Sequence, residues 1–182
     1  MNPAARGLRG STLEELLNFT NDRYRKQNLA IVQKIPTPIT PVEINKENRT
    51  ITLAYFEKKS TVDYIGVVQG IPICFDAKET KQKSLPIANI HAHQIEFMED
   101  FTNQGGIAFV LVYFSTYNEY YFLPFKSLKI FWNNAKAGGR KSISYDDFDK
   151  KYLVYNRSGA YIHYLEAINV FLKEDENKEG GE

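Results

Sequence analysis

Two aspartates, Asp63 and Asp76, flank a predicted β-hairpin turn. Residues 61–68 and 71–80 are rich in β-branched and aromatic types, and the Gln69-Gly70 pair between them fits a two-residue turn. In that register the two aspartates face each other, with Cβ atoms about 5 Å apart. Two carboxylates at about 5 Å repel by roughly 3 kcal/mol at an effective dielectric near 20. A shared proton or a bound divalent cation would relieve that repulsion.

Thr61 and Lys78 face each other in the same register, on the same side of the sheet as the carboxylates. Carboxylate and hydroxyl oxygens are hard ligands that suit Mg²⁺. A lysine beside them would hold a phosphate or stabilise negative charge that develops on phosphorus. The pattern therefore favours a metal-dependent nuclease. The alternative reading is that Asp63 and Asp76 are edge charges that discourage aggregation.

Length and composition indicate one globular domain. The chain has 182 residues and a formal net charge of +1, with 43% apolar and 25% charged residues. These values argue against a disordered or disulfide-rich protein. A single cysteine, Cys74, cannot form an internal disulfide, so we expect a reducing cytosol. No apolar run approaches the roughly 18 residues of a membrane span, and DNA binding would need a local basic face.

The order of predicted elements is a helix, then mostly strands, then helices. The expected helices are 11–26, 91–104, 127–134, 145–152 and 164–172. The expected strands are 29–32, 49–56, 61–68, 71–80, 107–114 and 119–123, and the apolar run at 29–32 indicates a buried strand. Residues 36–48 contain three prolines and are expected to form a loop or an edge excursion. This order predicts an α/β fold with a mixed central sheet.

Several chemistry-bearing residues have plainer interpretations. His91 and His93 are two positions apart, so they would not share a helix face, and zinc is disfavoured. Cys74 falls on the carboxylate face as a buried spacer rather than a nucleophile. The aromatic residues in 113–125 are expected in the core and at a dimer surface, with base stacking as the less favoured alternative.

Six segments carry a resemblance to a known family. They are RGSTLEELLNFTNDRY (9–24), AIVQKIPTPI (30–39), AYFEKKSTVDYIG (54–66), FDAKETK (75–81), HAHQIEFM (91–98) and GGRKSI (138–143). Over residues 7–171 the chain closely resembles the RecU Holliday-junction resolvases, which are restriction-endonuclease-like PD-(D/E)xK nucleases. The resemblance implies a nuclease domain with a mixed central β-sheet flanked by helices and a projecting stalk at about 40–56. From the residues themselves we expect a flexible basic arm at 1–10, a single domain at 11–173 and a charged, disordered tail at 174–182.

The resemblance also implies a homodimer that resolves four-way DNA junctions by paired symmetric nicks, with Mg²⁺ as cofactor and Mn²⁺ as a substitute. By position, the implied metal-site residues are Thr61, Asp63, Asp76 and Gln94, and Lys78 stabilises the transition state. Asp76 stands where the family pattern leads us to expect glutamate. The expected DNA contacts are Arg9, Arg49, Phe56, Lys58, Lys81, Arg140 and Lys141.

The implied setting is the bacterial cytoplasm, at the nucleoid, with a RecA-type recombinase and a branch-migration helicase as partners. Two other functions stay open at this point. One is a different nuclease of the same fold, such as a restriction or mismatch enzyme. The other is a weakly catalytic or non-catalytic DNA-binding and strand-annealing module that modulates a RecA-type recombinase.

Overall fold

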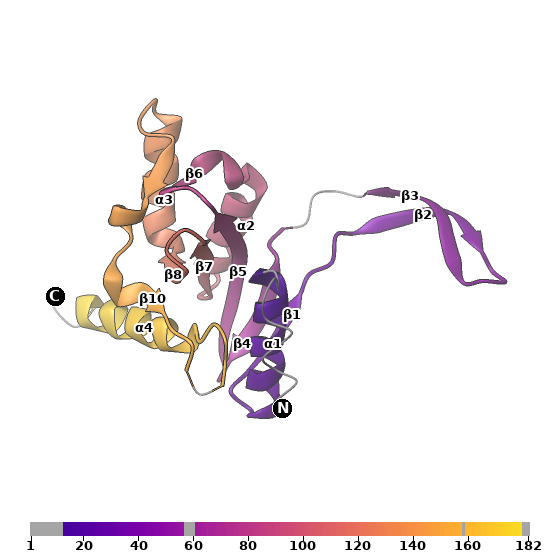
Figure 1. Ribbon diagram of the computed structural model, residues 1–182, viewed down its shortest axis with the longest axis horizontal. Coiled ribbons are helices and arrows are strands. Elements are labelled where there is room, and N and C mark those ends of the chain that lie inside the picture. Colours follow the sequence, from indigo (N-terminus) through magenta and orange to yellow (C-terminus); the bar gives the residue numbers. More distant parts are fainter. Residues whose placement is uncertain (1–12, 57–60, 158, 180–182) are drawn as a thin grey trace.

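The computed structural model describes residues 13–56, 61–157 and 159–179 (Figure 1). The predicted basic arm and the expected DNA contacts Arg9 and Lys58 lie outside these ranges. Within them, no helix is long and apolar enough to cross a membrane.

The described strands include a six-stranded mixed sheet in the order β1-β4-β5-β7-β8-β10. Strands β5 and β7 run parallel and the other neighbours are antiparallel. The bounds are β1 Ala30–Lys34, β4 Tyr64–Val68, β5 Ile71–Thr80, β7 Ile107–Phe114, β8 Glu119–Pro124 and β10 Leu153–Val154. The predicted α/β fold with a mixed central sheet is confirmed.

Helices cover both faces of this sheet. On one face, α1 (Leu13–Lys26) and α4 (Leu165–Glu179) contribute to a core that includes Phe75. On the other, α2 (Ala92–Asn103) and α3 (Phe125–Lys136) contribute to a core that includes Cys74. Side chains alternate along β5, so Asp76 and Lys78 share the α2–α3 face with Cys74. We call it the catalytic face, because the residues predicted to be catalytic lie on it.

Strands β2 (Ile39–Asn45) and β3 (Thr50–Phe56) form a separate antiparallel pair, the stalk hairpin. Figure 1 shows it projecting away from the body of the molecule, as the expected stalk does. Of the two alternatives predicted for residues 36–48, a loop or an edge excursion, the loop is wrong for the residues of β2. The register of the β2–β3 pair shifts directly after Pro41. Proline has no N–H to donate to the ladder, and an irregularity at this point lets the hairpin accommodate it.

The remaining short elements close the catalytic face. Strand β6 (Ser84–Pro86) pairs with β9 (Ser142–Ser144), and 3₁₀ turns follow at Ile87–Asn89, Tyr145–Asp147 and Lys150–Tyr152. The predicted helix at 145–152 is therefore wrong. The Ser144 and Asp147 side chains form a capping box at the turn Tyr145–Asp147. At the turn Lys150–Tyr152, the Asp149 side chain accepts from the Lys151 N–H. These bonds satisfy the backbone locally instead of continuing one helix.

Two further expectations need correction. Residues 29–32 were expected to form a buried strand, but β1 is an edge strand with Ile31 62% exposed. The tail was expected to be disordered from residue 174, but α4 continues to Glu179. Its extension is anchored because the Tyr152 hydroxyl donates to Glu174 at 2.7 Å and Lys126 pairs with Asp175.

Candidate catalytic site

Asp63 and Asp76 lock the open end of the β4–β5 hairpin. The Asp63 N–H donates to Asp76 Oδ1 at 2.8 Å, and the Ala77 N–H donates to Asp63 Oδ2 at 2.9 Å. The predicted register holds from Val68–Ile71 to Tyr64–Phe75, beyond which these side-chain bonds replace the backbone ladder. The two carboxylates are therefore brought together, as the sequence predicts.

Thr61 lies differently from its expected position. Strand β4 begins at Tyr64 rather than at residue 61, so Thr61 has no ladder partner and is not paired with Lys78. It occupies a partly exposed bend two residues before Asp63. The reason is that the Asp76 carboxylate takes the backbone N–H with which a continued ladder would have paired.

Asp76 is a buried carboxylate with one incompletely satisfied oxygen. Its exposed fraction is 0%, and Oδ2 has no hydrogen-bond partner among the described residues. Lys78 Nζ lies 3.4 Å from Oδ2, which makes an electrostatic contact without hydrogen-bond geometry. Burial, opposed by the Lys78 charge and reinforced by the Asp63 charge, raises the pKa of the Asp76 carboxyl to about 6. A buried carboxylate oxygen without a hydrogen-bond donor is suited to bind a divalent cation.

Two other candidate residues, Cys74 and Gln94, have structural roles. Cys74 is fully buried, and burial together with the Asp76 charge raises the pKa of its thiol to about 12, so it is no nucleophile at neutral pH. Gln94 is buried in the first turn of α2, where its Oε1 accepts from the His91 N–H at 3.0 Å. That bond holds the amide in the capping box of the helix.

The expected DNA contacts divide into two groups. Arg49 lies at the turn of the stalk hairpin with φ of 53°, Phe56 ends β3 with 80% exposure, and Lys81 is exposed after β5. Arg140 instead pairs with Asp147, and Lys141 Nζ donates to the Ala135 carbonyl near the end of α3. These two side chains hold the turn before β9, a role that sequence spacing did not indicate.

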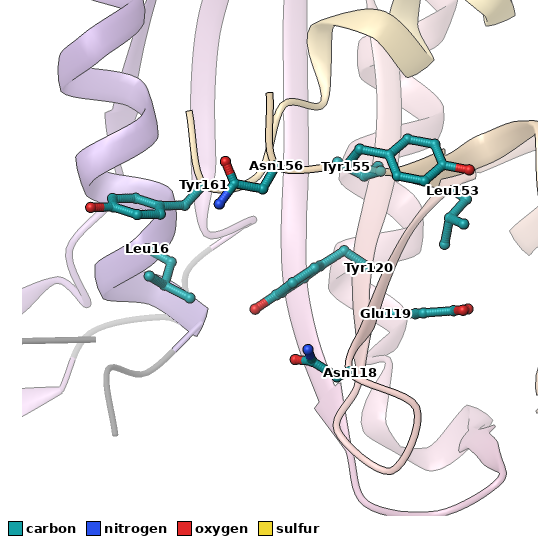
Figure 2. A pocket seen from close by; sticks show the side chains of 9 residues that line it. Leu16, Asn118, Glu119, Tyr120, Leu153, Tyr155, Asn156 and Tyr161 are labelled. Carbon is teal, nitrogen blue, oxygen red and sulfur yellow. The ribbon is translucent and has the colours of Figure 1, made fainter. Parts of the chain in front are cut away.

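A cavity of about 440 Å³ lies on the opposite face of the sheet. Figure 2 shows Leu16 and Tyr161 on one side of it and Tyr120 and Leu153 on the other, with the Asn156 amide between them. Leu16, Tyr120 and Tyr161 all pack against the α1–α4 core. The predicted catalytic residues Asp63, Asp76 and Lys78 do not line this cavity.

A family model and similar curated proteins point to one family. The family model described as "RecU: Recombination protein U" matches residues 8–170. A Holliday junction resolvase RecU from Oceanobacillus iheyensis is 46% identical over 166 residues, which is 88% of this chain and 85% of that protein. One from Geobacillus sp. (strain WCH70) is 47% identical over 141 residues, which is 75% of this chain and 70% of that protein. Among solved structures, the Archaeoglobus fulgidus Holliday junction resolvase Hjc matches with a TM-score of 0.38 and 12% identity, covering 60% of this chain and 77% of that one.

The Asp76 site makes a prediction about stability without metal. Because its folded pKa is raised from 3.8 to about 6, its contribution is most favourable below about pH 4 and is lost as pH rises through 6. Between pH 7 and pH 5 the wild type should gain about 1 kcal/mol from Asp76. Asp76→Asn should lack that gain. Denaturant unfolding in EDTA at pH 5, 6 and 7 measures it, with Asp22→Asn on the exposed side of α1 as the control. Parallel pH profiles for Asp76→Asn and the wild type would contradict the prediction.

Proposed function

Because the chain belongs to the RecU (Recombination protein U) family, we propose that it is an endonuclease that resolves four-way DNA junctions in recombination and repair. The observation that carries the chemistry is the braced Asp63–Asp76 pair with Lys78 beside it. A non-catalytic DNA-binding module is less well supported, because such a module has no use for a buried carboxylate with an orphaned oxygen.

A divalent cation fits this site. Backbone N–H groups take one oxygen of each aspartate, which leaves Asp63 Oδ1 and Asp76 Oδ2 for a ligand. Two carboxylates completed by water and a substrate phosphate are typical of Mg²⁺, and Mn²⁺ accepts the same oxygen ligands. In this proposal the Thr61 hydroxyl and the Gln94 amide oxygen, which retains a lone pair beyond its bond to His91, complete the shell.

The chain's own residues then have separate roles in phosphodiester hydrolysis. When bound, the cation supplies Lewis-acid activation of the scissile phosphate and of water. Asp63 and Asp76 fix its position, because both carboxylates are braced by backbone donors. Lys78, whose ammonium already lies 3.4 Å from Asp76, stabilises the negative charge that develops on the phosphate in the transition state.

The stalk hairpin supports recognition of the junction centre. Large apolar side chains remain exposed along both strands, and an isolated two-stranded hairpin gains little from them in water. We assign this surface to contact with bases at the crossover, with Phe56 as a wedge and Arg49 on phosphate. The exposed residues are Ile39, Val42, Ile44, Ile51, Leu53, Tyr55 and Phe56.

Paired symmetric cuts require two identical sites, which a two-fold homodimer supplies. We therefore extend the proposal to a homodimer that acts at the nucleoid. As the resemblance implies, its protein partners there are a RecA-type recombinase and a branch-migration helicase.

Cleavage of a labelled synthetic four-way junction tests the catalytic assignment. The wild type should nick opposite strands in Mg²⁺ and not in EDTA. Asp63→Asn should lower the rate by roughly 100-fold or more, because it removes a ligand of the activating cation, while Asp22→Asn should cut normally. Equal cutting of a matched linear duplex by the wild type would contradict junction resolution.

Light scattering tests the homodimer. The purified protein should have twice the 21.0 kDa mass of one chain at the concentrations that give paired nicks. A monomeric mass under conditions of paired cleavage would contradict the assembly.

A further inference from the structure

A group of aromatic and basic side chains lies on the catalytic face, beyond the end of β5. Tyr117 is in the β7–β8 turn, Tyr145 and Lys150 belong to the two 3₁₀ turns after β9, and Lys81 and Lys83 follow β5. We call these five residues the tyrosine–lysine patch. The catalytic assignments above make no use of Tyr117, Tyr145, Lys83 or Lys150.

The two tyrosines form a stacked pair that presents one open ring. The rings lie 3.9 Å apart at 22°, and Tyr117 keeps 36% of its surface exposed. Tyr145 is held from its hydroxyl, which donates to Glu119 at 2.6 Å and accepts from Lys150 Nζ at 2.6 Å. The Lys150 ammonium also lies 4.0 Å from the centroid of the Tyr145 ring. Tyr117 thus stacks on a ring whose position is fixed before any ligand arrives.

Two lysines beside this stack have unneutralised charge. Thr116 Oγ1 donates to the Lys81 carbonyl at 2.7 Å, and the Tyr145 N–H donates to the Lys83 carbonyl at 3.0 Å, so the turn is attached to both tyrosine segments. Both side chains are exposed and form no ion pair in the described part of the chain. Other surface lysines differ, since Lys126 and Lys129 each pair with a carboxylate.

The patch continues the line of the catalytic residues. Lys78 lies opposite Val112 in the β5–β7 ladder, and Thr80 lies opposite Phe114. The Phe114 ring in turn meets Tyr145 edge-on, with centroids 5.3 Å apart. At about 3.3 Å per residue along a strand, the patch begins roughly 10 Å beyond Lys78 on the same face.

We propose that the tyrosine–lysine patch binds the DNA strand next to the cleaved phosphate, with an unstacked base on the open face of Tyr117 and flanking phosphates at Lys81 and Lys83. This inference rests on the proposed function. Phosphate contacts add affinity for any DNA, whereas a stacking platform rewards only a base that has left its own stack. An opened crossover presents such a base and a matched duplex does not. Tyr117 therefore contributes selectivity for junctions.

Binding to uncut DNA in EDTA tests this division of roles. Tyr117→Leu should bind a four-way junction roughly 5- to 100-fold more weakly and leave duplex binding nearly unchanged. Tyr117→Trp should restore junction binding. The double variant Lys81→Gln with Lys83→Gln should weaken both DNAs alike and reduce the slope of log affinity against log salt by about 2. Tyr155→Leu, which alters a 48% exposed tyrosine at the cavity on the opposite face, is the matched control and should bind as the wild type does.

A second measurement needs no variant. 2-Aminopurine placed at the nucleotides beside the cut should lose fluorescence when the wild type binds, because its base stacks on Tyr117. If the wild type prefers junctions, either of two results would overturn this inference alone. One is that Tyr117→Leu is equally selective, and the other is that the fluorescence is unchanged at every position. A wild type without preference for junctions over duplex would instead overturn the proposed function.

Discussion

The exchange of hydrogen bonds between two aspartates and the opposite strands is the constraint on which the site depends. Each carboxylate of the Asp63–Asp76 pair takes a backbone N–H where the β4–β5 ladder would otherwise continue. The strands separate there, so the chain leaves the sheet through residue 61 towards the stalk hairpin. The same bonds orient one oxygen of each aspartate away from the backbone. The point where the hairpin opens is therefore also the point where a cation fits.

Burial makes this arrangement costly in the absence of metal. Asp76 lies on the most buried part of the sheet, between Cys74 below it and Val110 on the neighbouring strand. A charge in such surroundings is disfavoured unless it is paired, and Lys78 compensates only in part. Within this fold, the Asp76 carboxylate is therefore more favourable when it binds a cation or a proton. On the proposed function, stability and activity are opposed at Asp76, as is common at catalytic positions.

The two faces of the sheet carry different features. One face holds α1, α4 and the cavity of Figure 2. The other carries the carboxylates, Lys78 and the tyrosine–lysine patch along one line. On the proposed functions, chemistry is performed at Asp76 and a DNA strand is bound beyond Lys78. The stalk hairpin, whose strand β3 precedes β4 in the chain, reaches the junction centre from the end of β4 at which Asp63 lies.

The sequence by itself determined the parts that follow from local rules. Alternation and a two-residue turn were enough to place Asp63 opposite Asp76, and periodicity located α2, α3, β7 and β8. Tertiary structure decided what local rules do not encode. The pairing of β2 with β3 decided that Pro41 lies in a strand, and contacts with Tyr152 and Lys126 decided the length of α4. The early end of the β4–β5 ladder displaced Thr61 from its predicted position. Arg140 pairs with Asp147 and Lys141 with the Ala135 carbonyl, while the side chains of Lys81 and Lys83 form no ion pair with the residues that the structure describes. Which charge stays unpaired, and which tyrosine keeps an open face, is a property of contacts between segments far apart in the chain.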